Sequence, residues 1–237
     1  MSNSIYATLS RQDGLLKELQ VVANNIANTN TTGYKTDRAV FAEYLMSTGE
    51  TTPSLSMGGL AGHNFDLTQG SVKFTGGQFD LAVQGEGFFA VETQGGPRLT
   101  RAGSFQLNSD GELVAPDGAR VLSNGSAPIQ LPPDAEGISI AGDGTISADG
   151  QILGQVGVFT ANGQLQRDTD TRFTAAGGIT PSETATVLQG AVEASNVSPV
   201  LEMARMIEVQ RAYEAGQTAL EREDQRITQT ISTVRNR

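Results

Sequence analysis

The chain contains no cysteine, no tryptophan and a single histidine among its 237 residues. The absence of cysteine excludes disulfide bonds and thiolate metal sites, and it is compatible with either redox compartment. A Ser-His-Asp triad would have to use His63, which lies in a glycine-rich stretch, and no serine has a nucleophile signature around it. We therefore predict no catalytic residue, no metal site and no cofactor.

Basic residues and long apolar runs are also scarce. Lys and Arg number 16 against 26 Asp and Glu, which gives a net charge of -10. Nucleic acid requires a basic face, so we do not expect it as a partner, nor an anionic membrane surface. No run approaches the roughly 20 apolar residues that span a bilayer. The first residues lack the basic and apolar regions of a secretory signal, so we expect neither a membrane span nor a cleaved signal peptide.

An apolar stripe is present near each end of the chain. Its positions alternate in spacings of four and three residues, which places them on one side of a helix, as in a coiled-coil seam. The N-terminal stripe consists of Ile5, Leu9, Gln12, Leu16, Leu19, Ala23 and Ile26. The C-terminal stripe consists of Met203, Met206, Gln210, Tyr213, Gln217, Leu220, Asp224, Ile227, Ile231 and Val234.

These stripes predict one helix from Ser4 to Asn28 and another from Pro199 to Arg235. Neither helix has an apolar partner nearby in the sequence, so each must bury its stripe against the other or against other molecules. The alternative is an ordinary core helix within one domain. Turn-forming residues after Asn28 end the first helix, and we expect Gly33 to adopt a positive φ or to approach other backbone closely.

The middle of the chain is rich in turn dipeptides between short alternating segments. Asp-Gly or Asn-Gly pairs begin at Asp110, Asp117, Asn124, Asp143, Asp149 and Asn162. Such pairs are typical of type I′ hairpin turns, so the pattern predicts hairpins in a sandwich or barrel-like domain.

Two motifs in this region permit a second interpretation. Gly85-Glu86-Gly87 resembles a dinucleotide-binding loop, but a strand-like run begins at Phe88 where that loop requires a helix, so we predict a hairpin. The stretch from Asp143 to Gly150 lacks the spaced oxygen ligands of an EF-hand, so we predict two hairpin turns instead of a calcium site.

Together these patterns predict an α+β fold, in which N- and C-terminal helices pack as a coiled-coil-like pair beside a central all-β domain of hairpins. We assign residues 1–35 and 196–237 to a helical assembly domain and residues 66–195 to the β domain. Residues 36–65 are predicted to be an extended linker or loop, because residues 47–62 are mainly Ser, Thr and Gly with few apolar anchors.

Four blocks of sequence, in order along nearly the whole chain, resemble the signatures of flagellar rod and hook proteins. The blocks are Ala23-Asn24-Asn25-Ile26-Ala27-Asn28 with Thr31-Thr32-Gly33-Tyr34-Lys35; Asp80 to Phe89; Thr100 to Phe105 with Gly111 to Val114; and Gln189 to Glu214. The motif residues are Asn24, Asn25, Asn28, Gly33, Tyr34, Asn196, Gln210, Arg211 and Tyr213. Two positions depart from the family pattern, Gly216 in place of Asn and Leu99 in place of an aromatic residue.

The resemblance implies a structural subunit of the basal-body rod in the periplasm, exported through the flagellar type III apparatus without a cleaved signal. Its partners would be that apparatus and other proximal and distal rod subunits, in a homo- or hetero-oligomeric helical tube that transmits torque. We expect the assembly interface to comprise Ile5, Leu9, Leu16, Leu19, Ile26, Met203, Met206, Tyr213, Leu220, Ile227 and Ile231.

Two other functional classes remain as alternatives. A secreted all-β hydrolase would need a convergent acid, base or nucleophile arrangement, and the residues show none. An adhesin-like filament protein with a coiled-coil stalk would carry contiguous heptads in one segment, whereas here the heptads are divided between the two ends.

Overall fold

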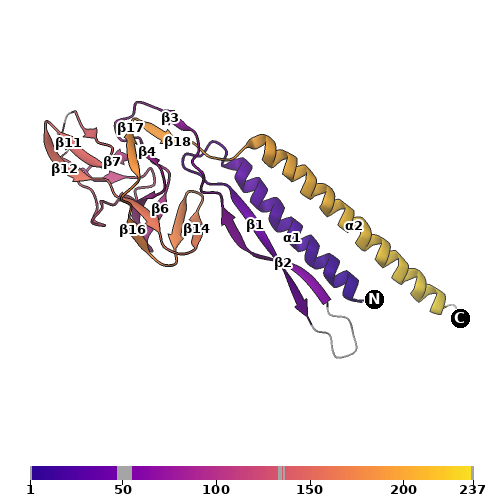
Figure 1. Cartoon of the computed structure of the whole chain (residues 1–237). Helices are drawn as coiled ribbons and strands as arrows, with labels where there is room; N and C mark the ends of the chain where they lie inside the picture. The colour runs from indigo at the N-terminus through magenta and orange to yellow at the C-terminus, as the bar shows by residue number, and fades with distance from the viewer. Residues whose placement is uncertain (1, 47–54, 133–134, 136, 236–237) are drawn as a thin grey trace. The chain divides into compact units, whose positions relative to one another are not determined.

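The computed structural model describes residues 2–46, 55–132, 135 and 137–235, which divide into two compact units (Figure 1). The helical unit draws on residues 1–27, 37–66 and 198–237. The β unit comprises Asn28–Thr36 and Leu67–Val197. Each unit therefore joins segments that are distant in the sequence, and the α+β fold class expected from the sequence is confirmed.

Two long helices, α1 (Ser2–Ala27) and α2 (Pro199–Arg235), form most of the helical unit. At 1.5 Å per residue they are about 39 Å and 55 Å long. Pro199 stands at the first helical position, where its missing N–H leaves no hydrogen bond unmade. Both helices were predicted from the apolar stripes, and their bounds agree with that prediction to within a few residues.

A long antiparallel hairpin, β1 (Asp37–Met46) and β2 (Leu55–Phe65), completes this unit. Helix α1 lies between the hairpin and α2 (Figure 1). Gly14 permits the close approach on the hairpin side, because a Cβ atom there would lie 3.2 Å from Cε1 of Phe41.

The predicted extended linker over residues 36–65 is therefore wrong wherever the chain is described. The region has few apolar anchors of its own, and its strands are stabilised by pairing with each other and by packing on α1, neither of which local composition reveals. The part of the predicted loop between residues 47 and 54 lies outside the described residues.

In the β unit, β5 (Phe88–Thr93) is the central strand, because it pairs with β6 (Gly96–Thr100), β9 (Arg120–Val121) and β13 (Val158–Ala161). The other strands of this largest sheet are β7 (Gln106–Leu107), β8 (Leu113–Val114), β14 (Leu165–Thr169), β15 (Arg172–Ala175) and β16 (Ile179–Pro181). Its order is β14-β15-β6-β5-β9-β8-β7, with β16 paired to β13.

Three smaller sheets complete the β unit. Their strands are β3 (Val72–Phe74), β4 (Leu81–Gln84), β10 (Ser139–Ile140), β11 (Thr145–Ala148), β12 (Gln151–Gln155), β17 (Thr186–Gln189) and β18 (Ala191–Glu193). The pairings are β10-β11-β12, β17-β4 and β18-β3. The pairings of β17 and β18 join the end of the β segment back to its beginning.

The turn dipeptides lie at turns, as predicted, but most of the turns are of another type. Only Asp149 and Gly150 both have a positive φ, of 51° and 78°, which is the type I′ requirement, and they link β11 to β12. In the turns ending at Gly111, Gly118 and Gly144, the glycine N–H donates to the carbonyl oxygen three residues earlier and only the glycine has a positive φ. These are three-residue connections, which the same dipeptides also suit.

The hairpin predicted at Gly85-Glu86-Gly87 is also wrong. The strand β5 does follow this loop where a nucleotide site would need a helix, but β4 pairs with β17 and β5 pairs with other strands. The loop therefore connects two sheets. Gly87 permits this close passage, because a Cβ atom there would lie 2.7 Å from Cγ1 of Val158.

One hydrophobic core joins the largest sheet to the β10-β11-β12 and β17-β4 sheets. Its members come from strands in several of them, and they include Leu81, Val83, Phe89, Val91, Leu113, Val121, Ile146, Val156 and Val187. Ile146 on β11 is 0% exposed, whereas Ile152 on the neighbouring strand β12 is 76% exposed. The same residue type thus occurs in the core and on the surface of one small sheet.

We expect Ile146→Ala to lower the free energy of unfolding of the full chain by about 2–5 kcal/mol, because it leaves a cavity in the core. Urea unfolding followed by circular dichroism in the strand region measures the change. Ile152→Ala is the matched control and should change stability little. Equal losses in the two variants would contradict this assignment of the core.

Candidate functional site

The two helices lie side by side and antiparallel, as three polar contacts show. Gln12 Nε2 donates to the carbonyl oxygen of Tyr213 (3.0 Å) near the middle of both helices. The Arg205 guanidinium contacts Glu18 at 2.7 Å. Asn25 donates to Glu202 (3.0 Å) near the end of α1 and the start of α2. The side-by-side arrangement expected from the stripes is therefore confirmed.

The predicted stripe on α1 divides between a covered and an exposed side. Positions seven residues apart, Ile5, Gln12, Leu19 and Ile26, are buried or half-buried. The intervening positions are exposed: Leu9 at 57%, Leu16 at 45%, and Ala23. Val21, Val22 and Asn25, which the stripe omitted, are buried instead.

The stripe on α2 divides in the same way. The covered side of α2 includes four stripe positions, Met206, Tyr213, Leu220 and Ile227. It also includes four residues that the stripe omitted, Glu202, Val209, Gly216 and Glu223. Met203, Gln210, Gln217, Asp224 and Ile231 are exposed. The side chain of Val234 is outside the described residues. The intramolecular seam thus uses half of each predicted stripe.

The stripes place Leu16 and Met203 in the seam between the helices, and this prediction is wrong, since both side chains are about half exposed. The reason is that several true seam positions carry Glu, Asn or Gly, which a search for apolar residues cannot select. The exposed half of each stripe retains Leu9, Leu16, Met203 and Ile231 as apolar side chains without cover in the isolated chain. Val200 and Ile207 extend this exposed apolar surface on α2.

A buried polar cluster in the helical unit centres on Asn25, one of the motif residues. Its amide accepts from the Asp37 N–H (3.0 Å) and donates to the Asp37 carbonyl oxygen (2.9 Å). The same amide donates to Glu202, which also receives Arg38 at 2.7 Å. Asn25 and Glu202 are 0% and 1% exposed. The cluster therefore ties the end of α1, the start of β1 and the first turn of α2 together.

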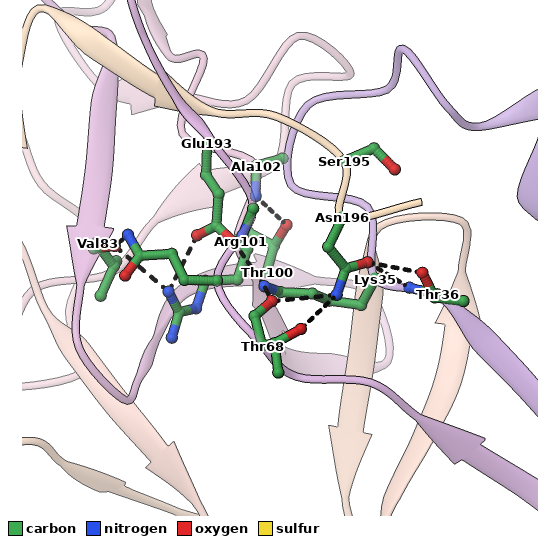
Figure 2. Close-up of polar contacts among 12 residues, drawn as sticks. Lys35, Thr36, Thr68, Val83, Thr100, Arg101, Ala102, Glu193, Ser195 and Asn196 are labelled. Carbon is green, nitrogen blue, oxygen red and sulfur yellow. Dashed lines mark hydrogen bonds and ion pairs between the residues drawn. The ribbon is translucent and has the colours of Figure 1, made fainter. Parts of the chain in front are cut away.

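A second buried cluster lies in the β unit and centres on Glu193 (Figure 2). One carboxylate oxygen receives Lys35 Nζ at 2.5 Å, and the other receives Arg101 at 3.0 Å. The side chains of Lys35 and Glu193 are fully buried, and that of Arg101 is 4% exposed. Burial removes these charges from water, so their stability depends on complete pairing.

Backbone groups pair with further polar atoms of this cluster, whereas the buried Arg101 Nε has no hydrogen-bond partner among the described residues. Lys35 Nζ donates to the Thr68 carbonyl oxygen (2.7 Å), and Arg101 donates to the Gly85 carbonyl oxygen (2.7 Å). The Gly70 N–H donates to the Glu193 carboxylate (3.0 Å). Three segments distant in sequence therefore converge on one carboxylate.

Motif residues surround this cluster in the β unit. Asn196 accepts from the Thr36 N–H and hydroxyl (both 2.8 Å) and donates to the Thr68 carbonyl oxygen (3.1 Å), as Figure 2 shows. Tyr34 is buried beneath the Arg167 guanidinium, which lies 4.5 Å from its ring centroid. Tyr34 and Asn196 thus fix two segment ends of the β unit, the end of Asn28–Thr36 and the end of Leu67–Val197.

Gly33 behaves as predicted. Its φ is +70°, and a Cβ atom there would lie 2.1 Å from the Ala102 nitrogen. Its N–H donates to the Glu193 carbonyl oxygen at 2.8 Å. A side chain at this position would therefore separate the 28–36 segment from the backbone beside Arg101.

The remaining motif residues differ in burial. Asn28 accepts from the Thr31 N–H and hydroxyl just after α1 ends. Asn24, Gln210 and Arg211 are exposed, and the Tyr213 side chain is half-buried on the seam. Most members of both clusters are recognisable in the sequence only as parts of motif blocks. The pairing of Lys35 and Arg101 with Glu193 could not be predicted, because no spacing rule connects positions so far apart.

His63 lies on β2 and not in a loop, contrary to the sequence interpretation. Its Nδ1 is 3.0 Å from the Asp37 carboxylate, and its ring stacks on Phe65. Within the described residues, no group of three His, Asp or Glu side chains is placed to hold a metal ion.

Two surface clefts among the described residues of the β unit, of about 590 and 570 Å³, are both lined by Asp117 and Arg172. A hydrogen bond from Arg172 (2.6 Å) holds the pKa of the Asp117 carboxyl below its ordinary value. This carboxyl is therefore ionised at neutral pH, and the stability that it contributes is lost in the acid range, as the pH falls through its lowered pKa.

None of the described helices is both long enough and apolar enough to cross a bilayer.

Three family models match successive parts of the chain. "Flagella basal body rod protein" matches residues 5–35, "Flagellar hook protein FlgE/F/G D1 domain" matches residues 82–148, and "Flagellar basal body rod FlgEFG protein C-terminal" matches residues 188–233. The first contains most of α1, the third contains nearly all of α2, and the second contains much of the β core.

Complete proteins are similar along almost their entire length. The flagellar basal-body rod protein FlgF of Caulobacter vibrioides is 38% identical over 227 residues, which cover 91% of each chain. FlgF of Mesorhizobium japonicum is 37% identical over 90% of each chain. The rod protein FlgG of Bacillus subtilis is 31% identical over 99% of this chain and 100% of its own.

We expect Glu193→Gln to lower the free energy of unfolding by about 3–5 kcal/mol, because it leaves two buried cations without a counter-ion. Chemical unfolding of the full chain measures the loss. The control is Glu92→Gln, which breaks an ion pair with Arg120 whose side chains are about 40% exposed, and should have little effect. If both variants lost the same stability, burial would not determine the importance of Glu193.

Proposed function

The chain belongs to the flagellar rod and hook protein family as a structural subunit of the basal-body rod, and we propose that it is the FlgF-type subunit of the proximal rod. The support is the higher identity to the FlgF relatives over the whole chain. The FlgG-type distal subunit is the alternative within the same family, since its relatives are similar over an equal length. The proposal assigns no catalytic activity to the chain.

We propose that the terminal helices assemble the rod through their exposed apolar positions. The observation that carries this proposal is the division of each stripe, since one half is used within the subunit and the other half remains exposed. Leu9 and Leu16 on α1 and Val200, Met203 and Ile207 on α2 are exposed apolar side chains on long helices. Burying each is worth roughly 1.5–3 kcal/mol.

The occupants of this surface would be the terminal helices of other rod subunits, of the same or a related type. Two different exposed faces, one on α1 and one on α2, favour head-to-tail contacts over a self-complementary pair. Head-to-tail contacts that do not close a ring generate a helical tube. In such a tube every subunit repeats the same burial, so a small loss per contact recurs along the assembly.

The two buried polar clusters suit a subunit that transmits torque. Each cluster fixes the segments by which the chain enters and leaves its own unit, through Asn25 in the helical unit and Glu193 in the β unit. Paired buried charges are costly to separate, so both clusters would resist local opening under load. We further propose export through the flagellar type III apparatus to a periplasmic position, without a cleaved signal.

Deletion of the gene in its own organism tests the proximal assignment. We expect cells that do not swim and basal bodies that contain no FlgG, because distal subunits would lack their base. Immunoblots of isolated basal bodies measure this, with the reintroduced gene as the control. Rods that still contain FlgG would reject the proximal position.

A charge on the exposed stripe tests the assembly surface. We expect Ile207→Asp to leave the fold of the free chain intact and to reduce incorporation into basal bodies at least about tenfold, because each contact would bury an unpaired carboxylate. Swimming assays and immunoblots of isolated basal bodies measure the effect. Ala219→Asp places the same charge at an exposed α2 position away from this stripe and should be tolerated. Normal incorporation of the Ile207 variant would exclude this face from the interface.

A further inference from the structure

The seam between α1 and α2 contains a polar side chain inserted against a glycine. Gln12 of α1 is 7% exposed, and its Nε2 donates to the Tyr213 carbonyl oxygen. Gly216 lies one turn further along α2. A Cβ atom at Gly216 would lie 1.9 Å from Gln12 Nε2 and 3.0 Å from its Cδ, so any other residue would displace the glutamine.

The local backbone does not explain this glycine. Gly216 lies inside a helix of 37 residues and is absent from the glycines with positive φ. Replacing alanine by glycine at an unobstructed helix position disfavours the helix about fivefold. The space that Gln12 occupies accounts for a residue that otherwise weakens α2.

Gly216 is the only residue without a side chain on the covered face of α2 in the described part of the chain. The positions of that face are Glu202, Met206, Val209, Tyr213, Gly216, Leu220, Glu223 and Ile227. A slip of the helices by one heptad would place Gln12 against Met206 and Val209, or against Leu220 and Glu223. In either register a side chain of α2 would occupy the space that the glutamine needs, and the glutamine would lose its hydrogen bond to the Tyr213 carbonyl oxygen.

We propose that the Gln12 side chain, by filling the space left open at Gly216, sets the register of the two terminal helices. We call this pair of residues the notch. A polar residue in a coiled-coil seam fixes the register at a cost in stability. Gln12 bears such a cost, because its Oε1 is buried and has no hydrogen-bond partner among the described residues. The proposal concerns pairing within one subunit and does not depend on which rod subunit the chain is.

Cross-linking of the purified full chain tests the register, and the absence of native cysteine makes it free of background. Glu18→Cys with Arg205→Cys reports the observed register, since these side chains are in contact. Glu18→Cys with Ala212→Cys reports a slip of one heptad. A short bis-maleimide applied to each pair gives two intramolecular yields, whose ratio measures the register and whose sum measures pairing of the helices.

We expect Gln12→Ala to lower the ratio of observed to slipped register roughly threefold to tenfold, the factor for one lost hydrogen bond, with little change in the sum. Gly216→Ala should lower both the ratio and the sum, because the new methyl group displaces Gln12. Combining Gln12→Ala with Gly216→Ala should restore the sum but not the ratio. Gln217→Ala, an exposed neighbour on α2, is the control and should change neither.

Four results would overturn the proposal. One is an unchanged ratio in the Gln12→Ala protein, and another is a ratio restored in the double variant, which would indicate packing alone. The third is a Gly216→Ala protein that pairs as well as the parent or better, as an unobstructed helix position would. A parent protein without the Glu18–Arg205 cross-link would equally reject the register on which the notch depends.

Discussion

The β unit depends on one buried carboxylate. Glu193 neutralises Lys35 and Arg101 and accepts the Gly70 N–H, so it binds three segments that the sequence separates by dozens of residues. Buried charges are tolerated only where geometry and hydrogen bonding compensate their desolvation. The positions of Gly33, Tyr34 and Asn196 follow from this requirement, because each brings backbone close enough for the cluster to be complete. Asn25 and Glu202 have the corresponding place in the helical unit.

The division of the helix stripes connects this architecture to assembly. Apolar residues that recur every three or four positions cover more of a helix surface than one neighbouring helix can bury. In this chain the heptad positions of Gln12, Leu19 and Ile26 serve the subunit, and those of Leu9 and Leu16 remain exposed. In the assembly proposed above, a rod subunit uses both surfaces, since one holds its own termini together and the other contacts its neighbours.

Several features of the fold could be predicted because they are local. The bounds of α1 and α2, the position of β5 and the positive φ of Gly33 follow from periodicity, apolar runs and turn chemistry. The hairpin of β1 and β2 could not be predicted, because its apolar anchors are few and its strands depend on α1. The connection through Gly85 and Gly87 is not the predicted hairpin. Local sequence reveals a turn there, but it does not reveal with which strands β4 and β5 pair.

The amino-acid sequence by itself determined that helices lie at both ends, that strands lie between them, and which family the chain resembles. Each of these features depends on residues that are close to one another along the chain. Tertiary structure alone decided which half of each stripe is covered, and that Glu202 and Gly216 belong to the seam beside Met206 and Tyr213. It alone paired Lys35 and Arg101 with Glu193. These outcomes depend on contacts between distant segments, where burial and geometry can place a charged residue or a glycine at a position that hydrophobic periodicity assigns to an apolar side chain.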